Sequence, residues 1–177
     1  LGIPMSDLSQ MFKQISRGHQ ISHKNLPGKT IEVSLGVHKK KGYTYNVVAF
    51  LEGSDPQLKD EYVLFGSHHD HNGVHEGKVY NGADDNGSGT VAMLELAQAM
   101  VEERPKRSVI FVWHTGEEKG LWGAHHFVAH SPVPVEKMSA ELNMDMLCRN
   151  DPNSLYLIGS NKLSTELDAA INDMNDK

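Results

Sequence analysis

The chain contains almost no cysteine, a single residue, Cys148, in 177. One thiol cannot form an internal disulfide or a zinc site made of cysteines alone. Basic residues are also scarce, because 17 Lys and Arg stand against 23 Asp and Glu, for a net charge of −6. Binding to a phosphate backbone relies on clustered Lys and Arg, so no nucleic-acid partner is expected. No apolar run approaches the roughly 20 residues that span a bilayer, so no membrane span is expected.

The length of the chain fits one domain with a sizeable core. After residue 60, runs with strand character alternate with runs of helical periodicity. This order is typical of an α/β layered sheet with parallel strand pairs. Strands are expected at residues 31–37 and 44–51, forming an antiparallel hairpin, and at 62–67, 108–114, 141–146 and 154–158.

Helical periodicity predicts four helices, at residues 6–16, 88–103, 121–129 and 163–174. In the second of these, Val91, Leu94, Ala97 and Val101 form the apolar stripe that is expected to pack on the sheet. The helix ends where Arg104 and Pro105 interrupt the pattern.

Imidazole and carboxylate side chains gather in four short motifs, GSHHDH at 66–71, GADDNGSG at 82–89, TGEEKG at 115–120 and NMDM at 143–146. Three of the motifs lie at or near the ends of predicted strands, and the GADDNGSG motif precedes a predicted helix. Open α/β sheets place ligand sites outside the carboxyl ends of their strands. Each motif alone has an ordinary explanation, such as helix capping by the two aspartates. Together, in this order, they predict a metal site.

These four motifs resemble the co-catalytic zinc aminopeptidases and their glutamate-carboxypeptidase relatives, over nearly all of residues 44–158. The resemblance implies a three-layer α/β fold with a central mixed, largely parallel sheet flanked by helices, here incomplete at the C-terminus. It implies an exopeptidase that removes N-terminal residues from peptides, using a metal-bound water and a glutamate general base. The expected cofactor is Zn²⁺, with two ions in a complete domain.

The resemblance also implies the metal ligands. His68 and Asp145 correspond to ligands of one zinc, Glu118 to a ligand of the other, and Asp84 to the carboxylate that bridges both. In the family, the peptide bond that follows the bridging aspartate is commonly cis, which places it here between Asp84 and Asp85.

Two further residues are implied to take part in catalysis. Glu117 corresponds to the general base that takes a proton from the attacking water, and Asp70 to the partner that holds the imidazole of His68. Whether His69 and His71 line the pocket is left open by the sequence.

The family completes its second zinc with a histidine far downstream of Asp145, but residues 146–177 contain none. The chain is therefore expected to be truncated, to hold one well-formed metal, and to be weakly active or inactive alone. Two tightly held ions would require His71 or a histidine of a neighbouring subunit. The absent part is also expected to leave apolar sheet surface exposed, which favours self-association.

Three alternatives to an aminopeptidase remain open at this stage. A carboxypeptidase acting on acidic dipeptides needs a basic cluster, and the candidates Arg107 and Arg149 lie outside the metal motifs. A one-zinc glutaminyl cyclase relative fits the intact Asp84-Asp85-Asn86 run less well than the two-metal enzymes do. A receptor-like domain without catalysis is disfavoured because each of the four motifs is intact.

The resemblance also divides the chain. Residues 1–20 are similar to the tail of a protease-associated insert found in some secreted members, and residues 21–177 to the catalytic domain. The chain opens at Leu1 and shows no signal sequence. A secreted or periplasmic location is therefore expected from the resemblance alone.

Overall fold

The computed structural model describes residues 27, 28, 30, 34, 36–149 and 151–175. The chain divides into two units, Leu1–Lys41 and Gly42–Lys177. In the first unit, the described residues form a turn at Pro27 and Gly28 and no helix or strand. The predicted helix over residues 6–16 lies outside the described residues. The predicted boundary between residues 20 and 21 stays a prediction.

Four strands of the second unit form one sheet, in the order β1-β5-β2-β6. They are β1 (Val47–Leu51), β2 (Tyr62–His68), β5 (Ser108–His114) and β6 (Met138–Asn143). β1 is antiparallel to β5, whereas β2 is parallel to both β5 and β6. All of β5 is buried, as expected for a continuous apolar run covered on both faces. The α/β fold with a mixed, largely parallel sheet is confirmed.

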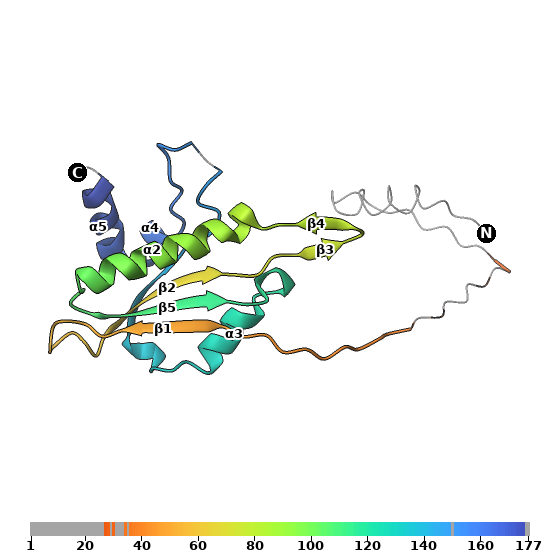
Figure 1. Ribbon diagram of the computed structural model, residues 1–177, viewed down its shortest axis with the longest axis horizontal. Coiled ribbons are helices and arrows are strands. Elements are labelled where there is room, and N and C mark those ends of the chain that lie inside the picture. Colours follow the sequence, from red (N-terminus) through yellow and green to blue (C-terminus); the bar gives the residue numbers. More distant parts are fainter. Residues whose placement is uncertain (1–26, 29, 31–33, 35, 150, 176–177) are drawn as a thin grey trace. The chain divides into compact units, whose positions relative to one another are not determined.

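Helices cover both faces of this sheet, α2 (Gly89–Glu102) on one and α3 (Trp122–Ala129) on the other (Figure 1). Successive side chains of a strand point to opposite faces. In β5, Phe111 accordingly packs in a cluster with Met93 of α2, while Ile110 packs in a second cluster with Phe127 of α3. Because β5 is apolar throughout and its side chains alternate between the two faces of the sheet, both faces are covered by helices. This arrangement gives the three layers.

The predicted apolar stripe of α2 is wrong at three of its four positions and right at Ala97. Val91, Leu94 and Val101 are 57%, 55% and 63% exposed. The side chains that pack on the sheet are those of Met93, Leu96, Ala97 and Met100. This helix is apolar on almost every side, so two stripes have equally good helical spacing. Packing against the sheet selects the one with the longer methionine side chains.

The carboxyl ends of three strands meet at one rim. His68 at the end of β2 pairs in register with His114 at the end of β5, and Gly66 pairs with Asn143 at the end of β6. β6 therefore begins and ends earlier than the predicted strand at 141–146. As a result, Asp145 lies in the loop beyond the strand, above the rim.

A hairpin that the sequence analysis missed follows β2. Its strands are β3 (Gly73–His75) and β4 (Lys78–Tyr80), paired antiparallel. The turn residues Glu76 and Gly77 have φ of 50° and 76°, as a two-residue hairpin turn requires. The irregular helix η1 (Ala83–Ser88) then carries the chain into α2.

The remaining predicted elements have mixed outcomes. β1 pairs with β5, and its predicted hairpin partner at 31–37 lies partly outside the described residues. Residues 154–158 do not form a strand, since no described strand pairs with them. The last predicted helix, at 163–174, is present as α5 (Thr165–Asn175). The other short elements are η2 (Glu117–Lys119), η3 (Val135–Lys137) and α4 (Ser160–Leu163). Among the described residues, no helix has the length and apolar character to cross a membrane.

Candidate metal centre

The centre of the site is the imidazole of His68, which is 4% exposed at the end of β2. Its Nδ1 lies 2.9 Å from the backbone oxygen of Asp70. A carbonyl oxygen only accepts, so Nδ1 carries the proton and Nε2 keeps its free lone pair. The Asp70 carboxylate, expected to hold this ring, is 3.8 Å from Nδ1 and instead accepts a hydrogen bond from the backbone N–H of Glu117 at 3.1 Å. Asp70 thus orients the imidazole through its backbone and the Glu117 loop through its side chain.

Three carboxylates surround the free Nε2 of His68. The nearest oxygens are Oδ1 of Asp85 at 3.1 Å, Oδ1 of Asp145 at 3.7 Å and Oε2 of Glu117 at 4.0 Å. Ligand atoms of His68, Asp85 and Asp145 all lie within 4.8 Å of one another. One nitrogen and two carboxylate oxygens at this spacing form a set that a divalent ion such as zinc accepts.

A second group of the same kind lies beside the first. It consists of His71, Asp85 and Glu118, whose ligand atoms also lie within 4.8 Å of one another. Nδ1 of His71 contacts Oε1 of Glu118 and is 3.9 Å from Oδ2 of Asp85. Asp85 therefore belongs to both groups, with Oδ1 directed to His68 and Oδ2 to His71.

The structure differs from the sequence-based assignment at Asp84, which belongs to neither group. Its Oδ1 accepts a hydrogen bond from the backbone N–H of Cys148 at 2.9 Å, and its Oδ2 lies 3.9 Å from Nε of Arg149. Non-helical angles at Asp85 turn the two neighbouring side chains in different directions. The cis peptide bond likewise lies one residue later than expected, between Asp85 and Asn86.

Asn86 fixes this loop in place and is 2% exposed. Its Nδ2 donates to Oγ of Ser67 at 3.2 Å and to the backbone oxygen of Met144 at 2.8 Å, while its Oδ1 accepts from the backbone N–H of Gly89 at 3.0 Å. One side chain thus joins the end of β2, the loop after β6 and the start of α2. Those are the segments that carry His68, Asp145 and Asp85.

The electrostatics of the cluster favour a cation. Burial raises the pKa of Glu117, and the nearby carboxylates of Glu118, Asp145 and Asp85 raise it further against the opposing effect of His68. Burial and neighbouring carboxylates also raise the pKa of Asp145. Oε1 of Glu118 is buried with no hydrogen-bond partner among the described residues. Buried carboxylate oxygens without a partner are costly, and a divalent ion would satisfy them. The residues present therefore fit a bound metal.

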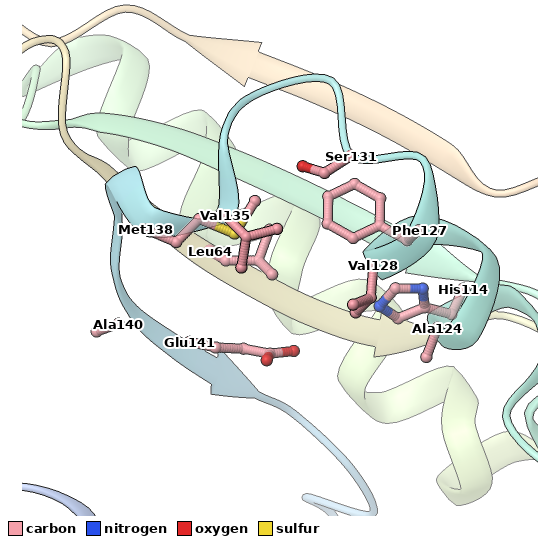
Figure 2. Close-up of a pocket in the computed structure, with 10 residues that line it drawn as sticks. All are labelled: Leu64, His114, Ala124, Phe127, Val128, Ser131, Val135, Met138, Ala140 and Glu141. Atoms are coloured by element: carbon pink, nitrogen blue, oxygen red, sulfur yellow. The ribbon is translucent and has the colours of Figure 1, made fainter.

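Two cavities adjoin at this rim. The first, about 180 Å³, is lined by His68, His114, Glu117, Leu121, Ala124, Glu141, Asn143 and Asp145. The second, about 310 Å³, is mainly apolar, and its walls come from β2, β5, α3 and β6 (Figure 2). The cavities share His114, Ala124 and Glu141, so an apolar space opens next to the carboxylate cluster.

The structure places His71, which the sequence left open, at the cluster. Sequence reasoning assigned no role to three further residues at or beside the cluster, Asp85, Asn86 and Glu141. His71 and Asp85 lie inside two of the motifs that the sequence analysis identified. The sequence located those motifs but did not show which of their side chains point to the cluster. For Asn86 the signal was its position between Asp85 and the glycines before α2. Glu141 is a polar residue in a strand that alternates half-buried and exposed side chains, a pattern that gives no functional signal.

Comparison with known proteins identifies the protein family to which this chain belongs. Residues 46–177 match the model of peptidase family M28. The match covers well over half of the chain, and the chain belongs to this family. The resemblance to zinc-dependent aminopeptidases and metalloproteases is therefore confirmed.

Three relatives illustrate the similarity. The chain is 38% identical over 122 residues to an aminopeptidase of Pseudomonas aeruginosa (strain UCBPP-PA14), a match that covers 68% of this chain and 21% of that protein. It is 32% identical over 161 residues to the probable leucine aminopeptidase 2 of Aspergillus oryzae, covering 89% of this chain and 28% of that protein. A probable zinc metalloprotease of Pyrenophora teres f. teres is 35% identical over 104 residues, 57% of this chain and 22% of that protein. The chain thus spans less than a third of the length of these relatives.

Proposed function

We propose that this chain carries the catalytic centre of a zinc-dependent aminopeptidase, which removes N-terminal residues from peptides. The observation that carries the proposal is the sharing of Asp85 by two neighbouring groups of metal-binding side chains. His68 and Asp145 would hold one zinc, Glu118 would hold the other, and Asp85 would contribute one carboxylate oxygen to each. A shared carboxylate supports a two-metal enzyme over a one-zinc glutaminyl cyclase relative.

Glu117 is proposed as the general base. Zinc, when bound, would supply a Lewis acid that polarises the scissile carbonyl and makes water more acidic. The carboxylate of Glu117 lines the cavity beside His68 but belongs to neither group of candidate ligands. It is therefore free to accept a proton from water and to return it to the departing amine.

The charges of the cavity favour a free amine over a free carboxylate in the substrate. Glu141 lines the same cavity as Glu117 and Asp145, and the described lining residues include no Lys or Arg. Arg107 is paired with Glu61 at 2.7 Å. The α-ammonium group of a peptide would find carboxylates here. The C-terminal carboxylate of an acidic dipeptide would find no Lys or Arg among the described residues that line this cavity, so the carboxypeptidase alternative is less well supported.

The replacement Glu117→Gln tests the proposal, because glutamine keeps the shape of the side chain but cannot accept the proton. In the complete parent protein, aminopeptidase activity on aminoacyl-nitroanilides should fall by at least ~100-fold in kcat with zinc content unchanged. Glu76→Gln makes the same chemical change at a side chain that is 86% exposed and should leave both unchanged. Loss of zinc from Glu117→Gln, with zinc retained in Glu118→Gln, would reverse the roles of the two residues. Hydrolysis of acyl-glutamate substrates alone would favour the carboxypeptidase.

The chain is also proposed to associate with a second copy of itself. Leu155, Tyr156, Leu157 and Ile158 are 64%, 75%, 56% and 95% exposed, which supports pairing of this surface with a second copy of the chain. Sedimentation should then show dimers or larger species that dissociate in Ile158→Lys.

A secreted or periplasmic location rests on the family resemblance alone, and fractionation of cells that produce the protein would test it.

A further inference from the structure

Two exposed imidazoles lie together at the C-terminal end of α3. His126 is in the last turn of the helix, and His130 is the residue at which the helix ends. Ala124 and Phe127 of the same helix face the apolar cavity (Figure 2), and His126 points to the opposite side of the helix. The rings of His126 and His130 are stacked, with 4.3 Å between ring centres and 23° between ring planes. Neither histidine belongs to the groups of candidate ligands at the rim.

Hydrogen bonds at the end of the helix decide which nitrogen of His130 can bind a ligand. The backbone oxygen of His126 accepts from the backbone N–H of His130 at 3.0 Å and lies 3.1 Å from Nδ1 of the same residue. A carbonyl oxygen only accepts, so Nδ1 carries the proton and the neutral ring has its free lone pair on Nε2. Side chains four positions apart on a helix lie one above the other. The helix end therefore presents two neighbouring imidazoles, one of them with its ligand nitrogen already selected.

We propose that His126 and His130 form a surface site for a divalent transition metal, with Cu²⁺ as the preferred ion. Two histidines at this helical spacing can present their nitrogens to one ion, as they do in helical zinc motifs. Metal–nitrogen bonds of about 2.0–2.1 Å place the two nitrogens about 3 Å apart. Exposed rings with centres 4.3 Å apart reach that spacing by a side-chain rotation, which takes only picoseconds to nanoseconds. The site goes beyond the proposed aminopeptidase function and does not depend on it.

The surroundings of the pair also suit a cation. Carbonyl groups at a helix C-terminus carry partial negative charge, which favours positive charge there. The helix itself contributes no Lys or Arg that would repel a metal ion. Among divalent ions, Cu²⁺ binds nitrogen and oxygen donors most strongly and accepts a tetragonal arrangement. Two imidazoles would fill part of that arrangement and leave the other positions to water, so the bound ion should exchange with solvent.

The competing explanation is that the stacked rings only complete the end of the helix. In that case the hydrogen bond from His130 to the His126 oxygen would stabilise α3, and metal would not bind. His130→Asn separates the two explanations. The asparagine amide can still donate to the same oxygen, but its nitrogen has no lone pair for a metal.

The experiment is a titration of the protein with Cu²⁺ in competition with a chelator of known affinity, followed by electron paramagnetic resonance. Copper bound by the carboxylate cluster contributes equally to every variant, because neither histidine belongs to that cluster. His126→Ala and His130→Asn should each weaken one equivalent at least ~10-fold, the lower end of what changes even in outer partners of metal ligands produce. The spectrum of that equivalent should show two nitrogen ligands in the unmodified protein and one in each variant.

His125→Ala is the matched control, because it removes an exposed imidazole from the same helix, next to His126. It should leave copper affinity unchanged, and circular dichroism should show that all the variants are folded. Equal affinity in the unmodified protein, His126→Ala and His130→Asn would overturn the site. An equal loss in His125→Ala would also overturn it, because copper would then bind exposed imidazoles in general. Lower stability in His126→Ala with unchanged copper binding would leave only the structural role.

Discussion

Replacement of Asn86 by alanine should destabilise the fold through the segments that carry the metal-binding residues. Its amide makes three buried hydrogen bonds, to Ser67 and Met144 as donor and to Gly89 as acceptor. Alanine makes none of them, and the backbone groups of Met144 and Gly89 lose this partner without gaining water. We therefore expect the strands and helices to persist but the rim to become less stable.

The magnitude follows from the number of bonds. A buried hydrogen bond contributes a net stability of about 0.5–1.5 kcal/mol, so three lost bonds predict a decrease of about 2–4 kcal/mol in the free energy of unfolding. Asn86→Asp should be no better tolerated. An aspartate can still accept from Gly89, but it places a carboxylate against the oxygen of Met144 and buries a charge. Asn153→Ala serves as the control and should change stability by less than about 0.5 kcal/mol, because its side chain bonds only Asp151 at the surface.

Urea denaturation in the presence of a chelator measures the effect without the contribution of metal. With a slope of about 2 kcal/mol per M, the expected loss moves the midpoint by roughly 1–2 M. A loss below about 1 kcal/mol in Asn86→Ala, or an Asn86→Asp protein as stable as the unmodified chain, would refute the argument that these three bonds hold the rim together.

Three further predictions concern the same rim. Asp85→Asn should lose zinc from both positions, whereas Asp84→Asn should keep at least the more tightly held ion; elemental analysis separates the two outcomes. Burial is the main cause of the lowered pKa of His114, and neighbouring histidines contribute less to lowering it. Its neutral imidazole therefore stabilises the fold above about pH 6.5, and this contribution is lost as the pH falls through the lowered pKa, with a slope of up to about 1.4 kcal/mol per pH unit. In His114→Gln that part of the pH dependence of urea midpoints should disappear; an unchanged dependence would show that the group titrates normally. Gly82→Ala should lower stability and zinc affinity more than Gly77→Ala does, as urea and zinc titrations would show. Both glycines have positive φ, but only at Gly82 would the new Cβ meet the backbone oxygen of Asp85, at 2.7 Å; equal effects would mean that only the backbone angle matters.

The sequence predicts the central strands and the helices beside them well because their signals are local. The apolar runs of β2 and β5 are long enough to be covered on both faces, and the predicted bounds differ from the observed ones by no more than a residue. Residues 154–158 show the limit of such signals. A β-prone run becomes a strand only when another strand satisfies its backbone, and no described strand lies beside it.

The choice between Asp84 and Asp85 in the site shows the same limit of local sequence signals. The motif with two adjacent aspartates predicts that a carboxylate reaches the metals, but nothing in its composition distinguishes Asp84 from Asp85. The choice is made by distant partners. The backbone N–H of Cys148 donates a hydrogen bond to the Asp84 carboxylate, whereas the imidazole of His68 faces the Asp85 carboxylate. Both partners come from segments that only the folded sheet brings to this loop. A family motif therefore locates the candidate metal centre, while long-range contacts that a linear pattern does not contain decide which carboxylate belongs to both groups of candidate ligands.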